Sequence, residues 1–151
     1  MSAGGTSGGG VNLRAHAPSQ HSAGPSPRLQ KMQIDAMLAR AHFEYQRERF
    51  DKAKALAQYL VTVFADDSGA KILAICAHKL GDEDTASKYY PQALNAFPTD
   101  LYVVVGYAEL LLDKHQFSEA ADLLRRAIEL DPAAQHPAGA RARVLILKAT
   151  A

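Results

Sequence analysis

The chain has 151 residues, an apolar fraction of 48% and a formal net charge of +1 from 17 basic and 16 acidic residues. This length and composition suit one globular domain. The near-neutral charge provides no long-range field that would gather nucleic acid or an anionic membrane surface, so neither is expected as a partner.

The sequence also lacks the signals of membrane insertion and secretion. No run approaches eighteen consecutive apolar residues, and the N-terminus does not have the basic-then-apolar layout of a secretory signal. The single cysteine, Cys76, cannot form an internal disulfide, which suits a reducing compartment. These features predict a cytoplasmic protein without membrane insertion.

Residues 1–28 form a tail rich in glycine, serine and proline. Six of the ten glycines and three of the seven prolines fall in residues 1–27, where Val11 and Leu13 are the only large aliphatic side chains after Met1. Such a segment buries too little apolar surface to offset the entropy of ordering it. Disorder is predicted for the tail, and residues 29–151 are predicted to form the folded domain.

The folded domain starts with a degenerate helical hairpin at about residues 34–66. Its turn contains the segment FDKA, which matches FSEA in a later hairpin. The step from Ala53 to the corresponding Ala86 is 33 residues, and no proline closes the unit. Terminal repeats of an array are commonly atypical, because one side faces solvent or a cap.

Two further hairpins, at about residues 67–100 and 101–134, repeat with a spacing of 34 residues. Each ends in a proline, Pro98 and Pro132, which cannot continue a helix. Small residues recur at matching offsets: Ala74 with Ala108, Ala86 with Ala120, and Ala93 with Ala127. Alanine lets two antiparallel helices approach closely without the backbone cost of glycine. The alanines are therefore predicted to lie where the helices cross.

Local features indicate where these helices begin and end. Asp66 and Asp100 are among the N-cap candidates of the second and third hairpins. Gly81 is expected to end a helix, and the three carboxylates at positions 82–84 suit the positive end of the next helix dipole better than a metal site. Pro91 falls inside a predicted helix, where it removes a backbone hydrogen bond, and a kink is expected there.

One more short helix is predicted after the third hairpin, at about residues 138–149. Four consecutive apolar residues at 144–147 need a surface to cover, and the exposed flank of the third hairpin provides one. The segment is therefore predicted to be a capping helix. Its basic residues Arg141, Arg143 and Lys148 are expected on the solvated side.

The 34-residue period, with alanine at these offsets and a closing proline, resembles the tetratricopeptide repeat, a helix-turn-helix unit. The resemblance implies an all-α fold in which three tetratricopeptide-type hairpins form a short right-handed superhelix, plus the C-terminal capping helix. It also implies that the first helix of each hairpin lines the concave side of the superhelix.

Mapping the inner positions of that repeat onto this sequence predicts a peptide-binding groove. Its predicted residues are Leu38, His42, Tyr45, Lys71, Ile75, His78, Tyr102, Val105, Glu109 and Leu112. Half of the mapped positions, which also include Asp35 and Ser68, are apolar or aromatic. A soluble protein rarely leaves a contiguous apolar concavity bare, so a peptide partner is expected. The alternative that the N-terminal segment or a second copy of the chain fills the groove stays open.

The sequence offers no pattern typical of catalysis or of metal binding. It has no glycine-rich phosphate loop, no His-Glu-x-x-His, no Cys-x-x-Cys and no nucleophile elbow. The four histidines of the folded part never fall three or four residues apart, as ligands on one helix face would. We expect no enzyme activity, no metal and no other cofactor.

A second resemblance concerns the layout of the whole chain. An N-terminal stretch predicted to be disordered, three repeats with the first degenerate and a single C-terminal helix resemble the layout of the small chaperones of bacterial type III secretion, especially the class that guards translocator proteins. Pro91 and the glycine content of the tail depart from that pattern. The segments AICAHKLGDEDTA and YAELLLDKHQFSEAADLL look similar to the second and third repeats of that class. The resemblance implies a cytoplasmic virulence chaperone that holds an extended or helical client segment in its groove, keeps it soluble before export and can form a homodimer.

Other uses of the scaffold lead to different expectations. A chaperone for a needle subunit or another export component of the same systems shares this scaffold, so it is an alternative to a translocator chaperone. From another class, a generic assembly scaffold of an envelope or pilus system is the alternative. Capture of heat-shock chaperone tails is disfavoured, because Leu38, His42, Ile72, Tyr102 and Gly106 occupy the places where such domains carry lysine, asparagine and arginine.

Overall fold

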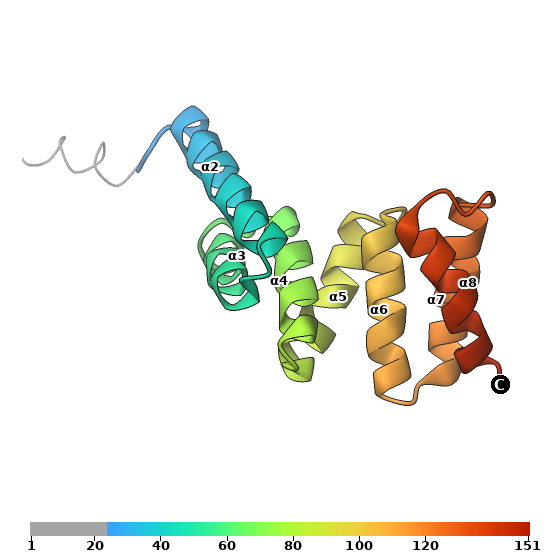
Figure 1. The fold of residues 1–151 in the computed structure, drawn as a ribbon. Helices are drawn as coiled ribbons and strands as arrows, with labels where there is room; N and C mark the ends of the chain where they lie inside the picture. The colour runs from blue at the N-terminus through green and yellow to red at the C-terminus, as the bar shows by residue number, and fades with distance from the viewer. Residues whose placement is uncertain (1–23) are drawn as a thin grey trace, which may run out of the picture. The chain divides into compact units, whose positions relative to one another are not determined.

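The computed structural model describes residues 24–151, and every regular element in that range is an α-helix, as predicted (Figure 1). The disorder predicted for the tail lies outside the described residues, except that Pro27 and Arg28 already belong to the first helix. The helices are α2 (Pro27–Gln46), α3 (Phe50–Phe64), α4 (Asp67–Lys79), α5 (Glu83–Ala96), α6 (Leu101–Asp113), α7 (Phe117–Leu130) and α8 (Pro137–Ala149). None of the helices within residues 24–151 has the length and hydropathy needed to cross a membrane.

The chain divides into two compact units, and the division falls inside α2, after Asp35. In the described part of the first unit, Lys31 and Asp35 form an ion pair of 2.8 Å, one helical turn apart. The second unit, Ala36–Ala151, holds the remainder of α2 and helices α3 to α8. All residues considered below belong to this second unit.

Within the second unit, helices that follow one another in the sequence pack together. The close neighbours are α3 with α4, α4 with α5, α6 with α7, and α7 with α8. In addition α6 contacts α4 on one side and α8 on the other. The first helices of the second and third hairpins, α4 and α6, are therefore neighbours, which is the nested order that the 34-residue period predicts.

The alanines that recur along the sequence lie at the packing sites. The recurring alanines with no exposed surface are Ala41, Ala53, Ala74, Ala86, Ala93, Ala108, Ala120 and Ala127. At 0% exposure each methyl group is enclosed by neighbouring side chains, and the predicted role of these residues in close helix packing is confirmed.

Helix α6 contributes to both apolar cores of the unit. Val103 and Leu110 belong to the first core, which includes Leu73 and Tyr90, whereas Val104 and Ala108 belong to the second core around Leu124. A helix that packs on two sides has only a narrow face left for solvent, which explains why its sequence is apolar almost throughout.

The three hairpin turns share one backbone geometry. Glu48, Gly81 and His115 have φ angles of 59°, 81° and 59°, in the left-handed region. The amide of the following residue donates to the carbonyl five residues back, with lengths of 2.9, 2.8 and 2.8 Å in the three turns. This is the Schellman arrangement, which favours glycine at the left-handed position. Only the second turn uses glycine there.

We expect Gly81→Ala to lower the free energy of unfolding by about 1 kcal/mol, because a Cβ is strained at this φ although no atom would touch it. His115→Gly, at the same turn position one repeat later, should not lower it, since the substitution relieves that strain. Urea denaturation followed by circular dichroism measures both values. Equal losses in the two variants would contradict this explanation.

Aspartates cap three successive helices, α4, α5 and α6. The side chains of Asp66, Asp82 and Asp100 accept hydrogen bonds from backbone amides at the starts of α4, α5 and α6. The capping roles predicted for Asp66 and Asp100 are thus observed, and the acidic run at 82–84 has the structural role expected of it. Helix α5 continues through Pro91 to Ala96, with Pro91 on its exposed side.

Helix α8 is joined to the third hairpin through the buried carboxylate of Asp131. This group accepts hydrogen bonds from the amides of Gln135 (3.0 Å) and His136 (2.9 Å). Gly139 lies against it so closely that a Cβ there would be 2.0 Å from Oδ2. The sequence predicts Arg143 on the solvated side of this helix, and that prediction is wrong. Arg143 is half-buried and donates hydrogen bonds to the carbonyl oxygens of Asp131 (2.8 Å) and Pro132 (2.9 Å).

The hydrogen bonds from the His136 and Gln135 amides hold the pKa of Asp131 below its usual value. A lowered folded-state pKa gives stability that is present above the unfolded pKa of about 3.9 and is lost as the pH falls through the folded value. We expect the stability difference between the wild type and Asp131→Asn to shrink as the pH falls below about 4. Gly139→Ala, whose Cβ would displace the carboxylate, should lose the same pH-dependent part of the free energy of unfolding. Denaturation at several pH values tests both variants. A difference that stays constant down to pH 2 would contradict this role for the carboxylate.

Candidate functional site

Two adjacent cavities open along the first helices of the hairpins. The first, of about 370 Å³, is lined mainly by α4, α6 and the start of α8. The second, of about 300 Å³, is lined by the end of α2, by α4 and by Tyr102 of α6. Tyr45, Ile75 and Tyr102 line both cavities, so the two form one continuous depression. We call this depression the inner groove.

Eight of the ten residues predicted for the groove line these cavities. They are His42, Tyr45, Lys71, Ile75, His78, Tyr102, Val105 and Glu109. Leu38 and Leu112 line neither cavity. Leu38 is half-buried against the first core, and Leu112, at 8% exposure, is part of the second core. Leu112 is enclosed because the side of α6 that carries it packs against the α7 and α8 cluster.

The sequence prediction missed several residues that line the groove, above all Tyr90, Gly106 and Arg141. Tyr90 belongs to α5, the second helix of its hairpin, and Arg141 belongs to the helix predicted only to cap the array. The one available signal is Gly106, since an isolated glycine in an apolar helical run usually has a packing reason. The other missed lining residues are Gln46, Ile72, Lys79, Pro137 and Ala138.

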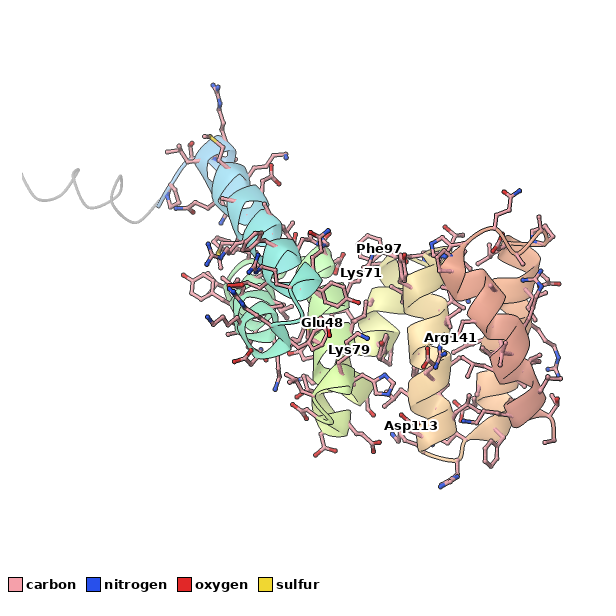
Figure 2. All side chains as sticks on the ribbon, viewed as in Figure 1. Glu48, Lys71, Lys79, Phe97, Asp113 and Arg141 are labelled. Atoms are coloured by element: carbon pink, nitrogen blue, oxygen red, sulfur yellow. The ribbon has the colours of Figure 1, made fainter. Side chains whose placement is uncertain are left out.

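Ion pairs between different helices flank the groove. Arg141 of α8 binds Glu109 of α6 through two hydrogen bonds of 2.9 Å, a bidentate contact that fixes geometry as well as charge. His78 of α4 lies 2.7 Å from Asp113 at the end of α6, measured from Nε2 to Oδ2. Figure 2 shows Arg141 directed at α6 and Asp113 at its far end. Arg141 and Glu109 neutralise each other's charge, and both contacts link neighbouring helices.

Two lysines complete the polar rim. Lys71 pairs with Asp100, and its ammonium lies 5.9 Å from the centre of the Phe97 ring. Figure 2 shows Lys71 and Phe97 next to each other. Lys79 lines the first cavity and has no acidic partner among residues 24–151, although its ammonium lies 5.4 Å from the centre of the Phe50 ring. The rim therefore retains one unpaired positive charge beside an otherwise apolar floor.

Aromatic rings form a rigid layer beneath and beside the groove. Tyr90 stacks on Tyr107, with ring centres 5.5 Å apart and planes 2° from parallel, and meets the edge of His78 at 6.3 Å. Tyr102 packs against His136 at 4.7 Å. Burial, together with the nearby charge of Glu109, raises the pKa of Tyr90, so its hydroxyl stays protonated at neutral pH. Rings held in this way can contact a ligand at little further entropic cost.

The described residues hold no cluster suited to a metal ion, and their one cysteine is buried. Across residues 24–151, no three or more His, Cys, Asp and Glu side chains are placed to hold a metal ion. The lone thiol, Cys76, is fully buried, and burial raises its pKa to about 11, so it is protonated and shielded at neutral pH.

We expect the Cys76 thiol of the folded protein to react with 5,5′-dithiobis(2-nitrobenzoate) at pH 8 at least about a hundredfold more slowly than that of the unfolded chain, because little thiolate exists at a pKa near 11. Absorbance of the released thionitrobenzoate gives both rates. Equal rates in the native and urea-unfolded protein would show that α4 is not packed as described.

Comparison with known proteins supports the architecture. Residues 77–144 match the model of the tetratricopeptide repeat family. A segment of 73 residues is 36% identical to aspartyl/asparaginyl beta-hydroxylase from Mus musculus. That segment is 48% of this chain, which spans only 10% of the length of the hydroxylase.

Solved structures of type III secretion chaperones share this fold. The chaperone SycD of Yersinia enterocolitica, in complex with a peptide of the translocator YopD, matches with a TM-score of 0.67 and 21% identity over 78% of this chain and 92% of SycD. PcrH, in complex with the chaperone binding region of PopD, matches with a TM-score of 0.71 and 21% identity over 84% of this chain and 95% of PcrH. PcrH from Pseudomonas aeruginosa alone gives a TM-score of 0.69 and 22% identity over 85% of this chain and 96% of PcrH. The predicted resemblance to this class of helical-repeat chaperone is confirmed at the level of the fold.

Proposed function

We propose that this protein is a non-catalytic chaperone that binds a segment of a type III secretion client, a translocator or another export substrate, in the inner groove. Binding covers an apolar part of the client and keeps it soluble in the cytoplasm until export. The observation that carries the proposal is the continuous apolar floor of Tyr45, Ile75 and Tyr102, shared by two cavities and flanked by ion pairs.

The physical reason is the surface that the groove leaves uncovered. Tyr102 is 52% exposed, and Tyr45 and Ile75 are half-buried in the isolated chain. Covering apolar surface contributes about 25 cal/mol for each Å² removed from water. The bidentate pair of Arg141 and Glu109 already has its hydrogen bonds, so a client does not have to break it in order to reach the floor.

The related folds support the same use of the groove. SycD is in complex with a peptide of the translocator YopD, and PcrH with the chaperone binding region of PopD. A further SycD structure is an alternative dimer, and self-association is part of the proposal for this chain too. At 21% identity these relatives supply the fold, and the client class of this chain is our inference from that fold together with the groove.

We expect Tyr102→Glu to weaken binding of the PopD chaperone binding region or the YopD peptide at least about tenfold, because exposed aromatic anchors commonly contribute most to an interface. Fluorescence anisotropy with labelled peptides measures the dissociation constants. Tyr59→Glu is the matched control. Tyr59 is 50% exposed and also packs on one aromatic ring, but it lines neither cavity.

Both variants should keep the helical circular dichroism signal of the wild type, since neither side chain is buried. Co-expression with full-length YopD or PopD extends the test to a whole translocator, whose soluble fraction should fall with Tyr102→Glu only. Equal binding by the two variants, or no binding by the wild type to any of these clients, would reject the groove as the client site.

A further inference from the structure

Tyr90 is a buried residue of α5 that nevertheless lines the inner groove. Tyr90 lies in α5, is 2% exposed and belongs to the first core, yet it lines the first cavity. Its ring is fixed by stacking on Tyr107 and by the edge contact with His78. A second-helix residue of a hairpin thus takes part in a surface built mainly from first helices.

Gly106 of α6 provides the opening for this hydroxyl. A Cβ at position 106 would lie 2.5 Å from the Tyr90 oxygen and 3.1 Å from the ring carbon that bears it. Any other residue at position 106 would therefore displace the hydroxyl or push the ring out of its stack. The pair of Tyr90 and Gly106 explains why α6 carries a glycine in its interior, where that residue costs roughly 1 kcal/mol relative to alanine.

No residue between 24 and 151 forms a hydrogen bond with the Tyr90 hydroxyl. Within the same range, no completely enclosed side-chain nitrogen or oxygen lacks a hydrogen-bond partner. The Tyr90 oxygen is therefore open to the cavity, where solvent can reach it. A polar group in a mostly apolar setting needs a partner when the cavity fills, because leaving it unpaired is costly.

We infer that the Tyr90 hydroxyl is a specificity-determining donor that hydrogen-bonds an oxygen acceptor of the client segment in the first cavity. The second cavity, lined by His42, Lys71 and Ile72 besides the shared floor, lacks this donor. The inference rests on the proposed function and adds a chemical requirement to it. The part of the client that enters the first cavity must present a carbonyl, carboxyl or hydroxyl oxygen.

Tyr90→Phe removes the donor and leaves the ring, and Tyr107→Phe is its matched control. The two rings are the partners of one stack, but Tyr107 does not line either cavity. We expect Tyr90→Phe to weaken binding of the labelled PopD region or YopD peptide roughly three- to tenfold, the effect of losing one hydrogen bond, and Tyr107→Phe to leave it unchanged. Gly106→Ala should also weaken binding, because its Cβ displaces the same hydroxyl.

An alanine scan of the peptide, measured with the wild type and with Tyr90→Phe, shows whether the acceptor is a side chain or a backbone carbonyl of the peptide. If one peptide substitution loses its effect in Tyr90→Phe, the acceptor is that side chain. If no position couples to Tyr90 although Tyr90→Phe still weakens binding, the acceptor is a backbone carbonyl. Equal affinities for Tyr90→Phe and Tyr107→Phe would overturn the inference, while the loss with Tyr102→Glu would still support the groove. Failure of the wild type to bind any peptide would overturn both.

Discussion

Ala74, Ala108 and Ala120 have no exposed surface, and the helices that carry them pack directly on their neighbours. At such positions a larger side chain has to separate the helices or leave its preferred rotamer, and overpacking of this kind typically costs 1–3 kcal/mol. The separation between neighbouring helices is therefore set by the smallest residues. This spacing brings α4, α6 and α8 side by side, and those three helices form the first cavity of the groove.

The shape of the inner groove depends on how α6 packs against its neighbours. Because α6 packs into both cores and also contacts α4 and α8, only a strip of it faces the cavities. That strip carries an aromatic ring at Tyr102, an opening at Gly106 and a charge at Glu109, one helical turn apart in each step. Contacts from Glu109 to Arg141 of α8 and from Asp113 to His78 of α4 hold the neighbouring helices in place. A single helix thus contributes both to the cores of the unit and to the floor of the inner groove.

The periodic part of the structure could be predicted from the sequence, because it depends on local spacing. Buried Ala86 and Ala93, the cap at Asp100 and the turn at Gly81 all follow from offsets along the chain. Leu112 was placed wrongly, since counting positions along a helix does not show which side a distant helix covers. The contributions of Tyr90 and Arg141 could not be predicted for a related reason. Each depends on a contact with a residue 16 or 32 positions away in the sequence. The isolated glycine at position 106 indicates that some group packs against it but not which one, and Glu109 has no distinguishing pattern.

Helix α8 is both the end cover of the second core and a wall of the first cavity. Ala142 and Leu145 are buried in that core, while Pro137, Ala138 and Arg141 face the groove. Its attachment depends on contacts with the loop before it, through Asp131 and Arg143. Proteolysis between α7 and α8 would therefore open one end of the groove and expose core residues in the same event. Loss of the groove's shape and exposure of the second core to further degradation would then occur together, without a separate signal.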